Sequence, residues 1–133
     1  MDIQVTARLI APDLESKITN ATPGQLIAIL YERAIRDLKG ACELFSLEGD
    51  PRSQAEAIRL IVHAQQVIAE LSRSLNDGEL AKNLARIYEY LQYRLTEAIS
   101  NREQAPVSEV IGLLSELHDA WKSVDVKGDK NSD

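Results

Sequence analysis

The strongest constraint on the fold is a spacing of apolar residues in steps of three or four, repeated in four separate stretches. Such spacing places the side chains on one face of an α-helix, whereas a half-buried strand alternates at every second residue. The chain is therefore predicted to be all-α, with four long helices. Their stripes are Ile27, Tyr31, Ala34, Leu38, Ala41 and Phe45; Ala57, Ile61, Ala64, Ile68, Leu71 and Leu75; Leu80, Leu84, Ile87, Leu91, Leu95 and Ala98; and Val107, Val110, Leu114, Leu117, Trp121 and Val124.

Capping residues predict where these helices begin. Thr22 can cap the first helix and Gln25 can complete a capping box with it, while Asp50 caps the second helix ahead of Pro51. The break at 76–78 (Asn-Asp-Gly) is short, so the second and third helices are expected to be antiparallel neighbours. Pro106 is expected to open the fourth helix.

The predicted architecture is one domain, an antiparallel up-down four-helix bundle with a short N-terminal arm or helix. The arm covers residues 1–21, the bundle residues 22–124, and a disordered C-terminal tail residues 125–133. Pro12 prevents a continuous helix in the arm. Its apolar residues can form a short helix or pack on the body as an arm, and they are Ile3, Val5, Leu9 and Ile10.

Charge and composition exclude several classes of function. A net charge of -6 disfavours binding to nucleic acid and to anionic membrane surfaces. The sequence lacks an apolar run of about 18 residues, the length that a membrane-spanning helix needs. Cys42 is the only cysteine, which excludes an internal disulfide and a cysteine-based zinc site. These features favour a cytoplasmic protein.

The sequence contains no recognisable set of catalytic or metal-binding residues. Phosphate-binding glycine motifs are missing, and a di-iron bundle would need Glu three residues before a histidine. Leu60 and Ser115 occupy those places before His63 and His118, so no metal, cofactor or enzymatic activity is expected. One alternative is a histidine phosphotransfer bundle that uses His63, although Gln66 stands where such domains normally carry a lysine.

The first and third helices carry more apolar residues than one buried face needs. Ile29 points away from the first stripe, and Tyr88, Tyr90 and Tyr93 lie outside the third. These residues either form a wide core face or lie under the N-terminal arm, or else they line an exposed groove for a partner helix or an extended segment. A further alternative is a client-free dimerising bundle in which they form a self-interface. A binding module is favoured over an enzyme.

The sequence also resembles that of a known protein family, from about Asn20 to Trp121. Residues 21–26 (Ala-Thr-Pro-Gly-Gln-Leu) are similar to the family's small-residue–Pro–x–x–Leu helix start. Residues 81–90 look like its Ala-x-Asn-Leu-x-x-Leu-Tyr-x-Tyr segment, and Leu117 with Trp121 resembles its closing Leu and Trp. The family is that of the flagellin-specific flagellar export chaperones, the FliS family.

The resemblance implies a cytoplasmic chaperone without cofactors that binds the disordered C-terminal segment of flagellin. Such a chaperone prevents premature polymerisation and helps deliver flagellin to an export gate component of the flagellar secretion apparatus. A homodimer is possible when the client is absent. The residues predicted to form or support the partner-binding groove, some of which must belong to the core, are Ile27, Ile29, Leu30, Tyr31, Asn83, Leu84, Tyr88, Tyr90, Leu91 and Leu95.

Overall fold

The computed structural model describes residues 7, 8 and 10–131, with side chains through Lys122. Within these residues every regular element is helical, which confirms the all-α prediction. A 3-10 turn and a short helix precede four long helices. The elements are η1 (Pro12–Leu14), α2 (Glu15–Thr19), α3 (Pro23–Phe45), α4 (Pro51–Arg73), α5 (Glu79–Asn101) and α6 (Gln104–Asn131).

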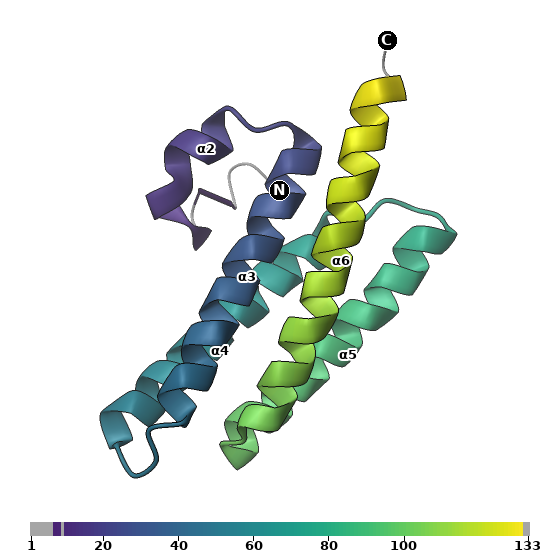
Figure 1. The fold of residues 1–133 in the computed structure, drawn as a ribbon. Coiled ribbons are helices and arrows are strands. Elements are labelled where there is room, and N and C mark those ends of the chain that lie inside the picture. The colour runs from purple at the N-terminus through teal and green to yellow at the C-terminus, as the bar shows by residue number, and fades with distance from the viewer. Residues whose placement is uncertain (1–6, 9, 132–133) are drawn as a thin grey trace.

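The four long helices pack side by side, and consecutive helices run in opposite directions (Figure 1). Helix α3 contacts α4 and α6, and α5 contacts the same two helices from the other side. The contact between α4 and α5 agrees with the adjacency predicted from their short connection. Helix α2 lies beside the first turns of α3, at the end of the molecule where α5 begins (Figure 1).

The predicted caps form as the sequence indicates. Thr22 accepts a hydrogen bond from the backbone N–H of Gln25, whose side chain accepts one from the backbone N–H of Thr22, completing the capping box. Asp50 caps α4 through the backbone N–H of Arg52. Gly78 precedes α5 with a φ of 132°, a conformation that L side chains rarely adopt, so glycine is required in this connection.

The core lies where the four stripes face one another, and most of the predicted stripe positions are buried there. Alternation of large and small side chains along α3 and α4 lets these helices approach closely. At Gly40, an added Cβ would lie 3.1 Å from Leu60 Cδ1. The largest fully buried apolar and aromatic side chains are Tyr31, Tyr88, Ile18, Leu30, Leu38, Ile61, Ile68, Leu71, Leu91, Leu95 and Leu114.

The N-terminal arm packs against the body. Ala7, Ala11 and Ile18 are fully buried, so the arm contributes apolar surface to the core. Arg33 of α3 fixes the turn η1, because its Nη1 donates to both carboxylate oxygens of Asp13, at 2.8 and 2.9 Å. The arm therefore covers the bundle on the side of α3, near the first turns of that helix.

The end of the last helix differs from the prediction. Helix α6 continues to Asn131, whereas the sequence predicted an end near Val124 and a disordered tail over residues 125–133. No proline lies in this stretch, and a helix started by a packed segment propagates at little cost per residue. Disorder of the tail stays a prediction. The arm residues Ile3, Val5 and Leu9 lie outside the described residues.

Candidate functional site

A long apolar groove runs between α5 and α6. Its wider section has a volume of about 460 Å³ and is mostly apolar inside, with one basic and one acidic side chain at the rim. Helix α5 supplies one wall and α6 the other. The lining residues are Arg86, Ile87, Tyr90, Leu113, Glu116 and Leu117.

A narrower section of about 160 Å³ continues this groove toward the start of α5. Leu117 lines both sections, so they form one surface, which we call the α5/α6 groove. In Figure 1, α5 and α6 separate as they run from the loop that joins them toward this end. The lining residues of the narrower section are Leu80, Leu84, Leu117, Ala120 and Trp121.

The groove exists because α5 is less completely covered than its neighbours. Helices α3, α4 and α5 each have 23 residues, but α3 and α4 bury eight of them and α5 only five. Leu80, predicted on the buried stripe, has 68% of its surface exposed. Leu117 and Trp121 of the fourth stripe are only partly buried. The prediction of a core position was therefore wrong for Leu80. For Leu117 and Trp121 it overstated the burial, because α6 diverges from this end of α5.

A network of polar side chains lies at the opposite end of the groove, beside its wider section. The Tyr90 hydroxyl donates to the Glu109 carboxylate at 3.0 Å, and Arg94 Nε donates to the same carboxylate at 2.6 Å. The hydrogen bond from Arg94 lowers the pKa of Glu109, and the adjacent carboxylate raises the pKa of Tyr90. The Tyr90 ring, 44% exposed, is thus tethered by its hydroxyl while its face remains open to the groove.

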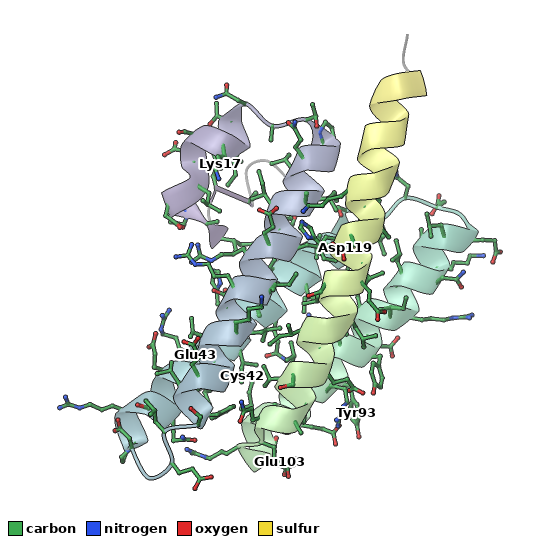
Figure 2. The ribbon with its side chains drawn as sticks, viewed as in Figure 1. Lys17, Cys42, Glu43, Tyr93, Glu103 and Asp119 are labelled. Atoms are coloured by element: carbon green, nitrogen blue, oxygen red, sulfur yellow. The ribbon has the colours of Figure 1, made fainter. Side chains whose placement is uncertain are left out.

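A second groove lies between the arm, α3 and α6, and it also reaches Trp121. It has a volume of about 620 Å³, and Gly24, Ala28 and Ile29 line its α3 side. Ile29 therefore points away from the first stripe, as its position in the sequence predicted. Trp121 lines this groove as well as the α5/α6 groove, so its indole is a wall that both share. Lys17 lies at the α2 side of the second groove, and Figure 2 labels it there.

The predicted partner-binding residues divide into three sets. Six are buried; five of these can only support a groove, whereas Leu84, 6% exposed, also lines its floor. Ile27 and Ile29 are partly buried, whereas Asn83 and Tyr90 are exposed. The buried six are Leu30, Tyr31, Leu84, Tyr88, Leu91 and Leu95.

Sequence reasoning left several groove residues out of the predicted site. The helical repeat places Leu80, Ile87, Leu117 and Trp121 on core stripes, and Leu113 is an apolar residue that lies beside the fourth stripe. Their apolar character was visible, but a helical repeat does not reveal which part of a stripe remains uncovered. The useful signal was the excess of apolar residues beside the stripes of α5 and α6.

His63 does not have the exposure that a phosphotransfer histidine needs. Its side chain is 20% exposed, and both ring nitrogens have partners. Nδ1 is 2.5 Å from the Asp37 carboxylate, and Nε2 is 2.8 Å from the backbone oxygen of Ile10 in the arm. His63 therefore links α4 to α3 and to the arm, and its geometry argues against the phosphotransfer alternative.

Other kinds of site find little support among the described residues. No group of three potential ligands from His, Cys, Asp and Glu comes together there to hold a metal ion. Within the same residues, no helix combines the length and apolar character needed to cross a bilayer. Cys42 lies on the side of α3 that faces α6, with its Sγ 3.7 Å from Ser108 Oγ (Figure 2).

Comparison with known proteins decides the family. The sequence model described as flagellar protein FliS matches residues 6–128, which is nearly the whole chain. The chain belongs to the FliS family. The flagellar secretion chaperone FliS of Salmonella typhimurium is 33% identical over 117 residues, covering 86% of this chain and 84% of that protein. The FliS of Bacillus subtilis is 28% identical over 109 residues, covering 81% and 79%, and the FliSB of Pseudomonas aeruginosa 32% over 114 residues, covering 84% and 87%.

Membership of the FliS family makes this chain a flagellar secretion chaperone rather than an enzyme. It confirms the family that the residues at 21–26 and 81–90 indicated. Among the described residues, the feature of this chaperone that offers an apolar surface to a partner is the groove between α5 and α6. The α5/α6 groove, with its tethered tyrosine, is therefore the candidate functional site.

Proposed function

We propose that this FliS-family chain binds the disordered C-terminal segment of flagellin, and that the α5/α6 groove is the main contact. The four long helices act as an antiparallel up-down bundle, a rigid frame for that groove. By covering an apolar segment that would otherwise associate with other flagellin chains, the complex prevents premature polymerisation. The observation that supports this most directly is a continuous apolar groove in a member of a secretion chaperone family.

The dimensions of the groove suit an amphipathic helix. From Leu80 to Tyr90 the α5 wall is about 15 Å long at the usual helical rise, the length of about three helical turns. A client helix would place apolar anchors at positions i, i+3 or i+4, and i+7 along it. Arg86 and Glu116 carry opposite charges at the rim, so the groove can accept polar residues of either sign on the flanks of that helix.

The remaining parts of the proposal concern where the chaperone works and what it meets next. We place it in the cytoplasm, where newly made flagellin has to be kept from assembling. After loading, the complex would deliver its client to an export gate component of the flagellar secretion apparatus. When no client is present, the open groove favours a homodimer, because an exposed apolar surface is covered most easily by a second copy. Sedimentation of the client-free chain at increasing concentrations tests the homodimer.

Titration calorimetry tests the client. The ligand is a peptide of about 40 residues from the C-terminus of flagellin from the same organism, long enough for the large contact area that coupled folding and binding requires. We expect a saturable one-to-one isotherm together with a gain of helical circular dichroism. Absence of heat, and of a complex on a sizing column, would refute the proposal.

Two matched variants locate the binding surface. Leu80 at the start of α5 and Leu47 beyond the end of α3 are both largely exposed, at 68% and 53%, and lie at opposite ends of the molecule. Leu80→Asp places a charge in the groove, whereas Leu47→Asp places the same charge far from it. We expect only Leu80→Asp to weaken peptide binding. Equal loss in both variants, or loss in Leu47→Asp alone, would place the client elsewhere.

A further inference from the structure

Three ring side chains from three helices form a hydrogen-bonded chain behind the groove. Tyr31 of α3 and Tyr88 of α5 are 0% and 1% exposed, and their hydroxyl groups are hydrogen-bonded to each other. Trp121 of α6 donates its indole Nε1–H to the Tyr31 hydroxyl at 3.2 Å. This series of hydrogen bonds therefore begins inside the core, at Tyr88, and ends at the indole of Trp121, which borders both grooves.

Core packing alone does not require the two hydroxyl groups. Phenylalanine would fill nearly the same volume at both positions without the cost of burying polar atoms. The tyrosine rings are tilted by 52° with centroids 6.4 Å apart, so they also make an ordinary aromatic contact that phenylalanines would retain. What the hydroxyl groups add is an acceptor, deep in an apolar core, for a donor that reaches in from α6.

That donor belongs to a side chain whose orientation shapes the site. Trp121 is partly buried and has one hydrogen-bonding group, its indole N–H. With that group bound to Tyr31, the nitrogen edge of the indole is held toward the core, while Trp121 lines both the α5/α6 groove and the second groove. Because Trp121 lines both grooves, an indole free to rotate would change the shape of each of them.

We propose that Tyr31, paired with Tyr88, is a positioning residue that fixes the Trp121 indole as the end wall of the α5/α6 groove and so preorganises this groove for its client. This inference rests on the proposed function. A wall that is already ordered loses less conformational entropy when the client binds, so the hydrogen bond contributes to affinity although neither hydroxyl touches the client. Burial raises the pKa of Tyr31, so its hydroxyl stays neutral and available throughout the physiological range.

The test uses Tyr31→Phe, and the fluorescence of Trp121, the only tryptophan of the chain, reports on it directly. We expect the tryptophan emission of the free variant to shift to longer wavelength and to become more accessible to acrylamide. Loss of one hydrogen bond predicts that the Kd for the flagellin peptide rises about 2- to 10-fold. The control is Tyr93→Phe, which removes the same atom from a ring that is 60% exposed on the outer side of α5 (Figure 2).

A double variant separates positioning from stability. Tyr31→Phe alone leaves the Tyr88 hydroxyl buried without its partner, which destabilises the fold in its own right. Tyr31→Phe/Tyr88→Phe removes both partners and restores an apolar pair, so its thermal midpoint should return toward that of the wild type. Its Trp121 still lacks an acceptor, so the emission shift and the higher Kd should persist.

The outcomes distinguish this inference from the proposed function. Unchanged tryptophan emission in Tyr31→Phe would overturn the positioning role, and so would full recovery of emission and affinity in the double variant. A shifted emission with an unchanged Kd would overturn the link between the indole and client binding. Failure of the proposed function appears earlier and separately, as an absence of peptide binding by the wild-type chain.

Discussion

Two leucines on the same helix should separate client binding from folding. Leu117 is partly buried and lines both sections of the α5/α6 groove, whereas Leu114, one turn earlier on α6, is 0% exposed. Leu117→Ala and Leu114→Ala remove the same atoms from the same helix. The groove assignment predicts that the first variant loses mainly affinity for the client and the second mainly stability.

The expected magnitudes follow from the burial of each side chain. Truncation of a fully buried leucine costs about 2–5 kcal/mol, a large share of the roughly 5–15 kcal/mol that stabilises a domain, so Leu114→Ala should lower the free energy of unfolding severely. Each methylene that a client newly buries contributes about 0.8 kcal/mol. Because Leu117 is already partly buried in the free protein, Leu117→Ala should cost about 1–2 kcal/mol of binding, or about 5- to 30-fold in Kd.

Urea unfolding followed by circular dichroism gives the stability of both variants, and calorimetry with the flagellin peptide gives the affinity. Leu117→Ala should retain most of the unfolding free energy while its Kd rises. Equal losses of stability in the two variants would mean that Leu117 belongs to the core. An unchanged Kd for Leu117→Ala would remove the centre of the groove from the binding surface and refute the assignment.

Three further predictions concern the rim of the groove, the arm and a helix cap. Tyr90→Ala should weaken binding of the flagellin peptide in calorimetry by about 1–3 kcal/mol with little loss of stability, because the ring is exposed and tethered at the groove. Asp13→Ala breaks the ion pair with Arg33 and should speed tryptic cleavage of the arm, whereas an unchanged cleavage rate would mean that apolar packing alone holds it. The Ser53 hydroxyl lowers the pKa of Asp50 below its ordinary value of 3.8, so the cap stabilises the fold above that pH and loses its contribution as pH falls through the lowered pKa. The difference in the free energy of unfolding between the wild type and Asp50→Ala should therefore be largest near pH 7 and shrink as pH falls through the lowered pKa, and a difference that does not change with pH would contradict the role of the charge.

The local features of the fold were predictable because they depend on neighbouring residues. The capping box of Thr22 and Gln25 and the cap at Asp50 are set by side chains that reach their own backbone within three residues. The stripes predicted the four long helices for the same reason. The arm was less accessible to this reasoning, because its attachment depends on Arg33 and His63, which lie far along the sequence and reach it only after folding.

Tyr31 and Tyr88 show why the predicted site mixed two kinds of residue. Tyrosine is typical of binding surfaces, since it offers a large rigid ring and a hydroxyl that tolerates water, and the family pattern drew attention to both positions. Each hydroxyl is instead satisfied by the other, 57 residues away in sequence. Only a tertiary contact reveals that pairing, so the sequence could not decide whether these two rings line the groove or support it from the core.

Leu80 and Leu84 show the physical limit most clearly. They lie four residues apart on one face of α5, yet Leu80 is 68% exposed and Leu84 only 6%. A helical repeat fixes the direction in which a side chain points from its own helix axis, but burial also requires a second helix at packing distance in that direction. Leu84 meets that condition and Leu80 does not, and α5 and α6 separate toward the start of α5 (Figure 1). In a chaperone, apolar residues that the neighbouring helix leaves uncovered at one end of a stripe remain available for a client to cover.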